Sequence, residues 1–319
     1  AAGLISDMPR HALEVIAFGG ILLVVLYLLG RNEQQETMVP LLALLGLAAV
    51  DLKSQYGEYA IIQEMGENIG LFDVSTSLVG HLQRERGKTA LFLSGGCTLE
   101  DVRPLREKTD GAMQRFTQAL GTAMLPQEKK KGGAETHSRL KQMRDRYSRP
   151  DEGLREQEIA DFNALIETLL DLEGEVANAR TTKGFGKILS SLMILEVAKE
   201  SAGQLRANGS SLLAMNKPLS GEEFALVLRL KSEVDANLTS PALVLRKESK
   251  EKLTAFPKQE SWRRTEEILK TLILKAGEGN YGVTGDAFFG VISQKIDDLA
   301  GLIDGETASM TSRLKTETA

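Results

Sequence analysis

Hydrophobic residues recur along most of the chain with the three- and four-residue spacing of amphipathic helices. Between residues 71 and 96 one apolar stripe contains Leu71, Val74, Leu78, Leu82, Thr89 and Leu93. At about 100° per residue these positions share one helical face. Because the same pattern returns from Tyr56 to about Gly305, the sequence predicts an all-α fold.

Clusters of turn-forming residues divide this region into about eight helices. The breaks fall at SGGCTLED, LPQEKKKGGAE, SRPDEG, NKPLSGEE, TSPALV and GEGNYGVTGD. Thr98 with Asp101 and Ser220 with Glu223 have the spacing of helix N-terminal caps. The run from Lys129 to Gly133 is predicted to be a solvated loop. Residues 158–184 and the long stretch after Ser190 could close two helical bundles that share a long helix.

Three cations lie on apolar faces of three different predicted helices. Arg86 is about 40° from the stripe that contains Leu82, whereas Arg84 points away from it. Arg206 lies within about 20° of its apolar stripe, and Lys295 falls on a third one. A buried unpaired charge costs several kcal/mol, so each cation needs a partner.

Two arrangements would satisfy these cations. Each could form a structural ion pair, for which Glu85, Glu196, Glu200 and Asp298 are candidate partners, or reach water along its own stem. Alternatively, the three could share a pocket in which a small anion replaces carboxylates. A planar oxyanion suits arginine, because two parallel N–H donors match two of its oxygens.

The beginning of the chain is strongly apolar. Residues 12–30 form a run that approaches the roughly 20 residues needed to span a bilayer, and we expect a membrane helix there. The run from Met38 to Val50 is shorter and is a marginal second span. Two buried helices of a soluble bundle remain the alternative. We expect residues 1–55 to form a membrane anchor, either one helix or a hairpin.

The first 50 residues or so resemble the last membrane helix pair of a bacterial ABC-type exporter, through MPRHALEVIAFGGILLVVLYLLG followed by MVPLLALLGLAAV. No Walker A glycine-lysine motif follows in the chain, so transport by this chain alone is not expected. The chain begins with alanine rather than methionine, from which we expect a fragment or a processed product.

Composition narrows the possible functions. The 319 residues carry a net charge of -5, with no broad basic surface expected, which argues against nucleic-acid binding. The single cysteine, Cys97, excludes an internal disulfide, and the three histidines are far apart, so neither a metal nor a cofactor is indicated. No nucleophile and base pair and no phosphate-binding loop are recognisable, and we expect no enzymatic activity.

Three segments resemble a known sensor family. SLVGHLQRERGKTALFLSGG, followed by LREKTDGAMQRF, is similar to the opening of the nitrate- and nitrite-sensing (NIT) domain. AKESAGQLRANGSSLLA resembles the arginine helix of its second half, and YGVTGDAFFGVISQKIDDL resembles its closing helix. The resemblance covers about residues 60–305.

The resemblance implies two stacked four-helix bundles that recognise nitrate or nitrite near their junction through arginines. Matched motif by motif, the ligand-binding residues are Arg84, Arg86 and Arg206, with Lys295 where the family has an arginine. Phe288 and Phe289 stand in place of the usual tryptophan. Because lysine keeps the charge but loses bidentate geometry, this position departs from the family.

These features together predict a membrane-anchored sensor. Residues 56–305 would form the sensing domain, and residues 306–319 would be a polar tail or the start of an output region that this chain lacks. By analogy with membrane-anchored sensors of this family we expect an extracytoplasmic sensor at the inner membrane, and signalling would suit a homodimer. The competing hypothesis is a helical scaffold, attached to a transporter-derived membrane segment, in which the cations only pair with carboxylates.

Overall fold

The computed structural model describes residues 20, 23, 27, 35–181 and 184–318. The chain divides into two units, residues 1–61 and residues 62–319. The described α-helices are α3 Gln35–Leu93, α4 Leu99–Thr122, α5 Gln127–Arg146, α6 Arg155–Asn178, α7 Phe185–Met215, α8 Gly221–Leu238, α9 Lys247–Ala255, α10 Glu260–Leu274 and α11 Gly285–Thr318. Short 3-10 turns, Glu152–Leu154 and Phe256–Lys258, precede α6 and α10. The described residues contain no strand, which confirms the all-α prediction.

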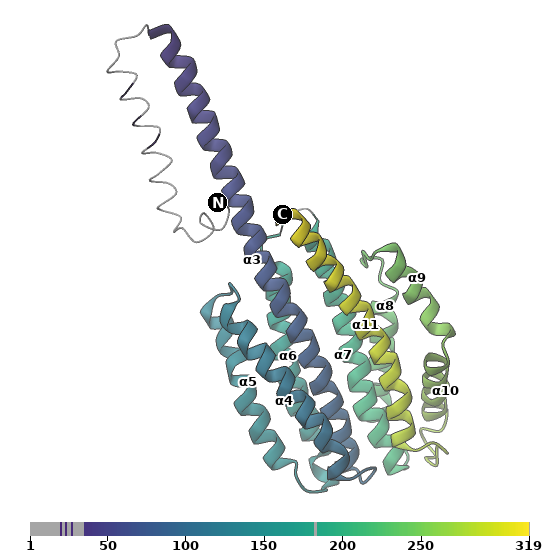
Figure 1. Ribbon diagram of the computed structural model, residues 1–319. Coiled ribbons are helices and arrows are strands. Elements are labelled where there is room, and N and C mark those ends of the chain that lie inside the picture. The colour runs from purple at the N-terminus through teal and green to yellow at the C-terminus, as the bar shows by residue number, and fades with distance from the viewer. Residues whose placement is uncertain (1–19, 21–22, 24–26, 28–34, 182–183, 319) are drawn as a thin grey trace. The chain divides into compact units, whose positions relative to one another are not determined.

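The helices of the second unit lie in two groups, with the short α9 against α11 (Figure 1). The part of α3 that starts at Ile62 lies with α4, α5 and α6, while α7 packs against α8 and α11, and α10 against α11. Two main hydrophobic cores fill this unit, and the first reaches into both groups, since it contains Phe116 of α4 and Trp262 of α10. The central helices contribute to both, because Leu192 of α7 and Leu299 of α11 lie in the first core, whereas Leu212 and Ile292 of the same helices lie in the second.

Local capping explains where several helices begin and end. Asp101 Oδ2 accepts a hydrogen bond from the backbone N–H of Thr98 at 2.8 Å, and Ser220 Oγ accepts one from that of Glu223 at 3.2 Å. Both predicted caps are therefore confirmed, at α4 and α8. After α3 the chain turns at Gly95, whose φ of 77° is left-handed and suits glycine.

The solvated loop predicted at Lys129–Gly133 is wrong. These residues lie inside α5, because lysine is a good helix former and the glycines allow close packing. A Cβ on Gly133 would lie 2.9 Å from Leu120 Cδ2 and 3.2 Å from Phe116 Cζ of α4. The two glycines that suggested a loop instead let α5 approach its neighbours.

The helix count also differs from expectation. The described residues form nine α-helices, whereas the sequence predicted about eight, because α9 and α10 are separated by the turn that contains Pro257. Residues 306–318, which we expected to be a polar tail or the start of an output region, continue α11. Within them Glu306, Thr307, Met310 and Leu314 are buried.

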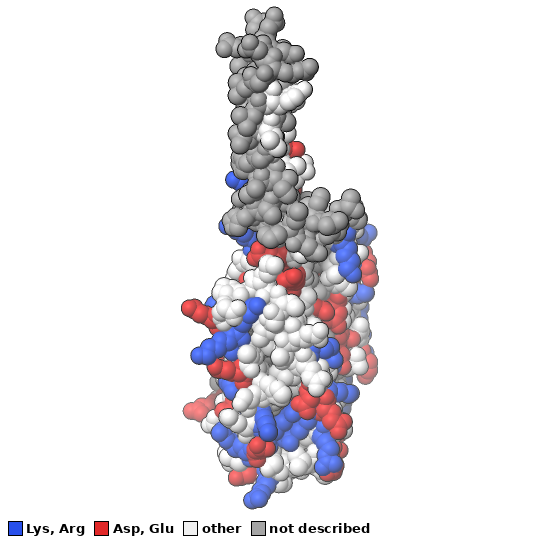
Figure 2. Space-filling view, turned by 60° about the vertical axis from the view of Figure 1, so that its left-hand side comes forward, with Lys and Arg blue, Asp and Glu red and all other residues white. Residues whose placement is uncertain are grey.

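The membrane predictions fall largely outside the described residues. Only residues 20, 23 and 27 of the run 12–30 are described, and residues 38–50 belong to α3. Among the described residues, no helix is both long enough and apolar enough to cross a membrane. Acidic and basic side chains are interspersed over the face seen in Figure 2, as expected from the modest net charge of -5.

Candidate functional site

Arg86 lies on the buried face of α3, where the apolar stripe placed it. Its Nη1 donates to Glu200 Oε1 of α7 at 2.5 Å and to Asn163 Oδ1 of α6 at 2.6 Å, and its Nη2 donates to Glu200 Oε2 at 3.3 Å. Glu200 is one of the four carboxylates that the sequence offered as partners for the buried cations. The charge of Arg86 is therefore neutralised inside the protein.

Glu200 is the centre of a hydrogen-bond network. Besides Arg86, it accepts from Gln83 Nε2 at 2.8 Å and from Gln204 Nε2 at 2.9 Å. Gln83 and Arg86 are three residues apart and therefore lie on the same face of α3. The network fixes the carboxylate between α3 and α7, so that it acts as a permanent counter-ion for Arg86.

Arg84 lies near the surface, as its position away from the stripe predicted. Its Nη2 forms an ion pair with Asp297 of α11, and both side chains are about one-third exposed, at 31% and 40%. The pair joins α3 to α11. Because solvent screens such a pair, we expect it to contribute little to stability.

Arg206 of α7 is the least compensated of the three arginines. Its side chain is fully buried, and its one hydrogen bond runs from Nη1 to Ser293 Oγ of α11 at 2.9 Å. Both Nε and Nη2 lack a hydrogen-bond partner among the described residues. These two atoms lie on one edge of the guanidinium plane, so their N–H groups form an open fork.

The charges around this fork do not cancel. Burial lowers the pKa of Arg206 to about 9, and repulsion by Arg84 and Arg86 acts in the same direction, so that the group still carries its proton at neutral pH. Burial raises the pKa of Glu158 well above its usual value, although Arg86 opposes this. Two of the three guanidinium groups form ion pairs, Arg86 with Glu200 and Arg84 with Asp297. Arg206 is the arginine of this cluster for which the described residues supply no ion pair.

Two glycines allow α3 and α7 to bring the arginines together. A Cβ on Gly203 would lie 2.8 Å from Arg86 Nη2, and one on Gly87 would lie 3.3 Å from Arg206 Nε. Larger residues at these positions would push against the guanidinium groups. The glycine of the QRERG motif therefore has a packing role beside the free edge of Arg206.

Lys295 makes its contacts with α10 rather than with the arginines. Its Nζ lies 3.2 Å from Glu266 Oε1 of α10 and 4.5 Å from the centre of the Trp262 ring. The predicted burial on the third stripe is confirmed, since Lys295 is only 5% exposed. The structure brings Arg84, Arg86 and Arg206 together, whereas Lys295 joins α11 to α10.

Sequence reasoning missed several partners in the arginine cluster. Asn163 and Ser293 belong to helices that no pattern in the sequence brings next to α3 or α7. Gln83 had a usable signal, because it precedes Arg86 by three residues within the same motif. Asp298, offered as a partner for a cation, instead accepts a hydrogen bond from Trp262 Nε1 at 2.9 Å.

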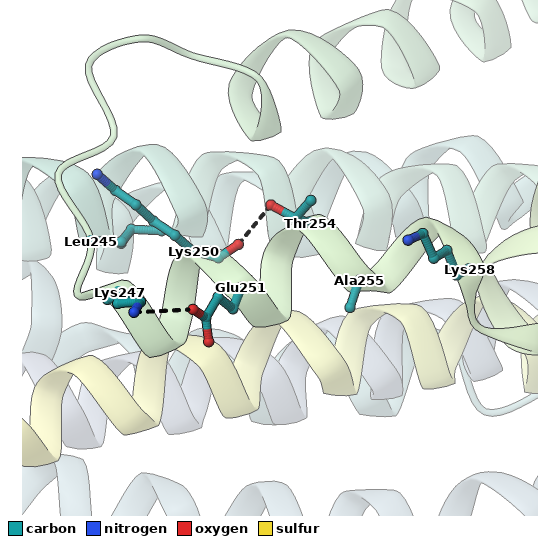
Figure 3. A pocket seen from close by; sticks show the side chains of 7 residues that line it. All are labelled: Leu245, Lys247, Lys250, Glu251, Thr254, Ala255 and Lys258. Carbon is teal, nitrogen blue, oxygen red and sulfur yellow. Dashed lines mark hydrogen bonds and ion pairs between the residues drawn. The ribbon is translucent and has the colours of Figure 1, made fainter.

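Two other features do not offer a comparable site. A surface pocket of about 550 Å³ lies along α9 (Figure 3). Three lysines line it, Lys247, Lys250 and Lys258, together with Leu245, Glu251, Thr254 and Ala255. Its lysines are exposed, and Lys247 has Glu251 at 3.9 Å. The thiol of Cys97 is half-buried, and burial raises its pKa to about 11, which does not suit a nucleophile.

The fold and the cluster define an all-helical protein with a buried cationic centre. The chain belongs to the nitrate and nitrite sensing (NIT) family, whose pattern matches residues 77–311. Its fold is similar to a solved structure of the NasR transcription antiterminator, with a TM-score of 0.69 and 20% sequence identity over 84% of this chain and 75% of the other. No curated protein sequence matches the chain. Membership in this family indicates a sensing role.

Proposed function

We propose that the open fork of Arg206 is the recognition element for nitrate or nitrite, with the ion-paired Arg86 and Arg84 beside it. The observation that supports this proposal is the pair of unpartnered N–H donors on a fully buried guanidinium. Leaving buried polar groups unsatisfied is costly, so a protein gains by supplying them with a partner.

The chemistry of the cluster favours a small monovalent oxyanion. Two parallel donors match two oxygens of a planar anion, and the single guanidinium without an ion pair matches one negative charge. A dianion such as sulfate would bury a charge that the cluster does not balance. Nitrate and nitrite meet both conditions, in agreement with the family to which the chain belongs.

Ligand binding would act on the packing of three helices. Arg206 belongs to α7, while its hydrogen-bond partner Ser293 belongs to α11 and its neighbour Gly87 to α3. An anion bound to the fork would lie among groups that α7, α11 and α3 together hold in position. We infer that the bound and free forms differ in how α3 and α11 pack on α7, and that an output region outside this chain reads the difference.

We also propose that the chain acts at the inner membrane, with an extracytoplasmic sensor that forms a homodimer. The apolar run 12–30 supports an anchor, and the exposed side chains of Leu44, Leu47 and Val50 on α3 support contact with lipid or a second copy. Recovery of the full chain in the soluble fraction of cells that express it, as a monomer by sedimentation, would contradict this part.

The competing function is a scaffold without a ligand. It is favoured by the internal pairing of Arg86 with Glu200 and of Arg84 with Asp297. It does not account for Arg206, which has no carboxylate within ion-pair distance among the described residues. The two functions therefore differ in what they expect from Arg206.

Isothermal titration of nitrate and nitrite into the full chain tests the proposal. We expect saturable heat that the Arg206→Met variant loses, because one charge-assisted hydrogen bond is worth about 1.5–3 kcal/mol, or about tenfold or more in affinity. Arg229→Met is the matched control, since Arg229 is an exposed arginine paired with Glu233 on α8.

Sulfate and chloride serve as anion controls, and circular dichroism verifies that each variant is folded. Equal heats for the wild type and Arg206→Met would rule out the fork as the binding element. Silence toward both nitrate and nitrite, in a folded sample, would leave the scaffold as the better account.

A further inference from the structure

The surface above Arg206 is the contact between α3 and α11, and two ion pairs close it. Arg84 of α3 pairs with Asp297 of α11, and one turn further along α3 Lys88 Nζ lies 2.7 Å from Asp286 Oδ1. Between Asp286 and Asp297 on α11 lie Phe289 and Ser293, the two residues that contact Arg206. The pairs therefore flank the place where Arg206 is covered.

Phe289 covers the buried guanidinium. The centre of its ring is 4.9 Å from Arg206 Cζ and 5.2 Å from Lys88 Nζ, so that two cations contact the same ring. Each such contact is favourable, because the electron-rich face of an aromatic ring attracts a positive charge. The cations that hold Phe289 over Arg206 are therefore the same ones that would attract an anion.

Exposure falls steadily along this path. The side chain of Asp286 is 63% exposed, that of Lys88 is 15% exposed, and Arg206 is fully buried. Phe289 is half-buried between them. An anion from solution would meet Lys88 and Phe289 before it could reach Arg206.

We propose that Phe289 is a gate on the anion site and that Lys88 is the cation that draws the anion to it. This inference rests on the proposed function of Arg206. The negative face of the ring repels an approaching anion, whereas a bound anion replaces the ring as the partner of Arg206. The gate opens when Phe289 leaves the guanidinium, and Lys88 is released from the ring in the same step.

Gly87 allows the ring of Phe289 to approach α3 closely. A Cβ at this position would be 3.0 Å from Phe289 Cε2 and 3.3 Å from Arg206 Nε. Alanine at position 87 would displace the ring or the guanidinium. Glycine here therefore determines how tightly the closed gate fits.

The gate can be tested by the reactivity of Arg206 itself, in the absence of any ligand. A dicarbonyl reagent that modifies arginine is applied to the full chain, and the modification rate of Arg206 is followed by peptide mass spectrometry. We expect Phe289→Ala to raise the rate by about 2- to 30-fold, which is what the loss of one cation–π contact is worth as an opening equilibrium. Phe289→Leu should give a smaller increase.

Phe224→Ala is the control for this experiment, since Phe224 is half-buried on α8 and lies apart from the arginines in sequence and contacts. Gly87→Ala provides an independent variant that displaces the gate without removing it, and it should also raise the rate. Unchanged reactivity of Arg206 in Phe289→Ala and Gly87→Ala, with folding verified by circular dichroism, would overturn the gate.

Nitrate titration then tests the role of Lys88. Lys88→Gln should weaken nitrate affinity at low ionic strength and reduce its dependence on salt, because long-range attraction is screened by salt. Lys231→Gln is the matched control, since Lys231 is a partly buried lysine of α8 that pairs with Asp235 of α8 and Glu266 of α10. An affinity and salt dependence equal to those of the wild type would remove Lys88 from the proposal.

The results separate the gate from the proposed function. If Phe289→Ala makes Arg206 reactive and nitrate protects it, both stand. If Arg206 becomes reactive but no variant binds nitrate or nitrite, the covering role stands and the ligand assignment fails. If the wild type binds nitrate and Phe289→Ala changes neither reactivity nor affinity, the function stands and the gate fails.

Discussion

At the scale of single residues, the protein compensates the charges of its four candidate site cations in several ways. Arg86 has a carboxylate of its own, Arg84 shares one at the surface, and Lys295 combines Glu266 with the ring of Trp262. Only Arg206 is left with a hydroxyl and an aromatic ring. This difference, more than burial alone, distinguishes a structural cation from a candidate ligand site.

A second buried polar group, Glu173, contributes to the way stability depends on pH. Glu173 of α6 is fully buried, and burial together with the nearby charge of Glu196 raises its pKa well above the usual 4.5, although Lys199 opposes this. The folded state therefore holds the proton more tightly than the unfolded state does. The stability linked to this group is complete below about pH 4.5 and is lost as the pH rises toward the folded pKa.

We expect Glu173→Gln to flatten this dependence. Glutamine cannot ionise, so that the free energy of unfolding should fall less between pH 5 and pH 8 in the variant than in the wild type. Urea denaturation at several pH values measures the slope. Glu175→Gln, on the same helix but at the surface, should keep the slope of the wild type, and an equal slope in Glu173→Gln would contradict the assignment.

At the scale of the helices, periodicity predicted which faces are buried and could not predict what they meet. The stripes that contain Arg86 and Arg206 depend only on the 3.6-residue repeat within one helix, and both arginines are buried as expected. Their partners Asn163 and Ser293 depend on how separate helices are rotated against each other. Composition misled at Lys129–Gly133, because the same glycines suit a loop and a close helix contact.

The small residues of α7 make its packing sensitive to added volume. A Cβ on Gly209 would lie 2.6 Å from Phe288 Cε1, and Phe288 is fully buried. We expect Gly209→Ala to destabilise the protein by about 1–3 kcal/mol through overpacking. Thermal or urea unfolding measures the change.

For Gly80 of α3 we expect the opposite effect of an added methyl group. A Cβ there meets nothing within 4 Å, so that Gly80→Ala should stabilise the protein by about 0.5–1 kcal/mol through helix propensity alone. If both variants were stabilised, the close contact between α7 and Phe288 would not exist in solution.

At the scale of the whole second unit, two hydrophobic cores share their central helices. Leu192 and Leu212 of α7 lie in different cores, as do Leu299 and Ile292 of α11. Neither core can lose α7 or α11 without exposing part of the other. The unit should therefore behave as one cooperative structure rather than as two independent bundles.

Calorimetry can test this expectation. We expect one transition for residues 62–319, with equal calorimetric and van't Hoff enthalpies. The Leu230→Ala variant, whose cavity is confined to the second core, should lower the midpoint without splitting the transition. Two resolved transitions, or a shoulder that only Leu230→Ala produces, would show that the cores unfold separately.

The contact between Lys295 and Trp262 has a practical consequence. Trp262 is the only tryptophan of the chain, and it stacks on Phe256, bonds to Asp298 and lies beside an ammonium group of α11. Indole emission depends on nearby charge and hydrogen bonding. Any displacement of α11 against α10 would therefore change the native fluorescence, and the protein carries its own optical reporter for motion that begins at the arginines.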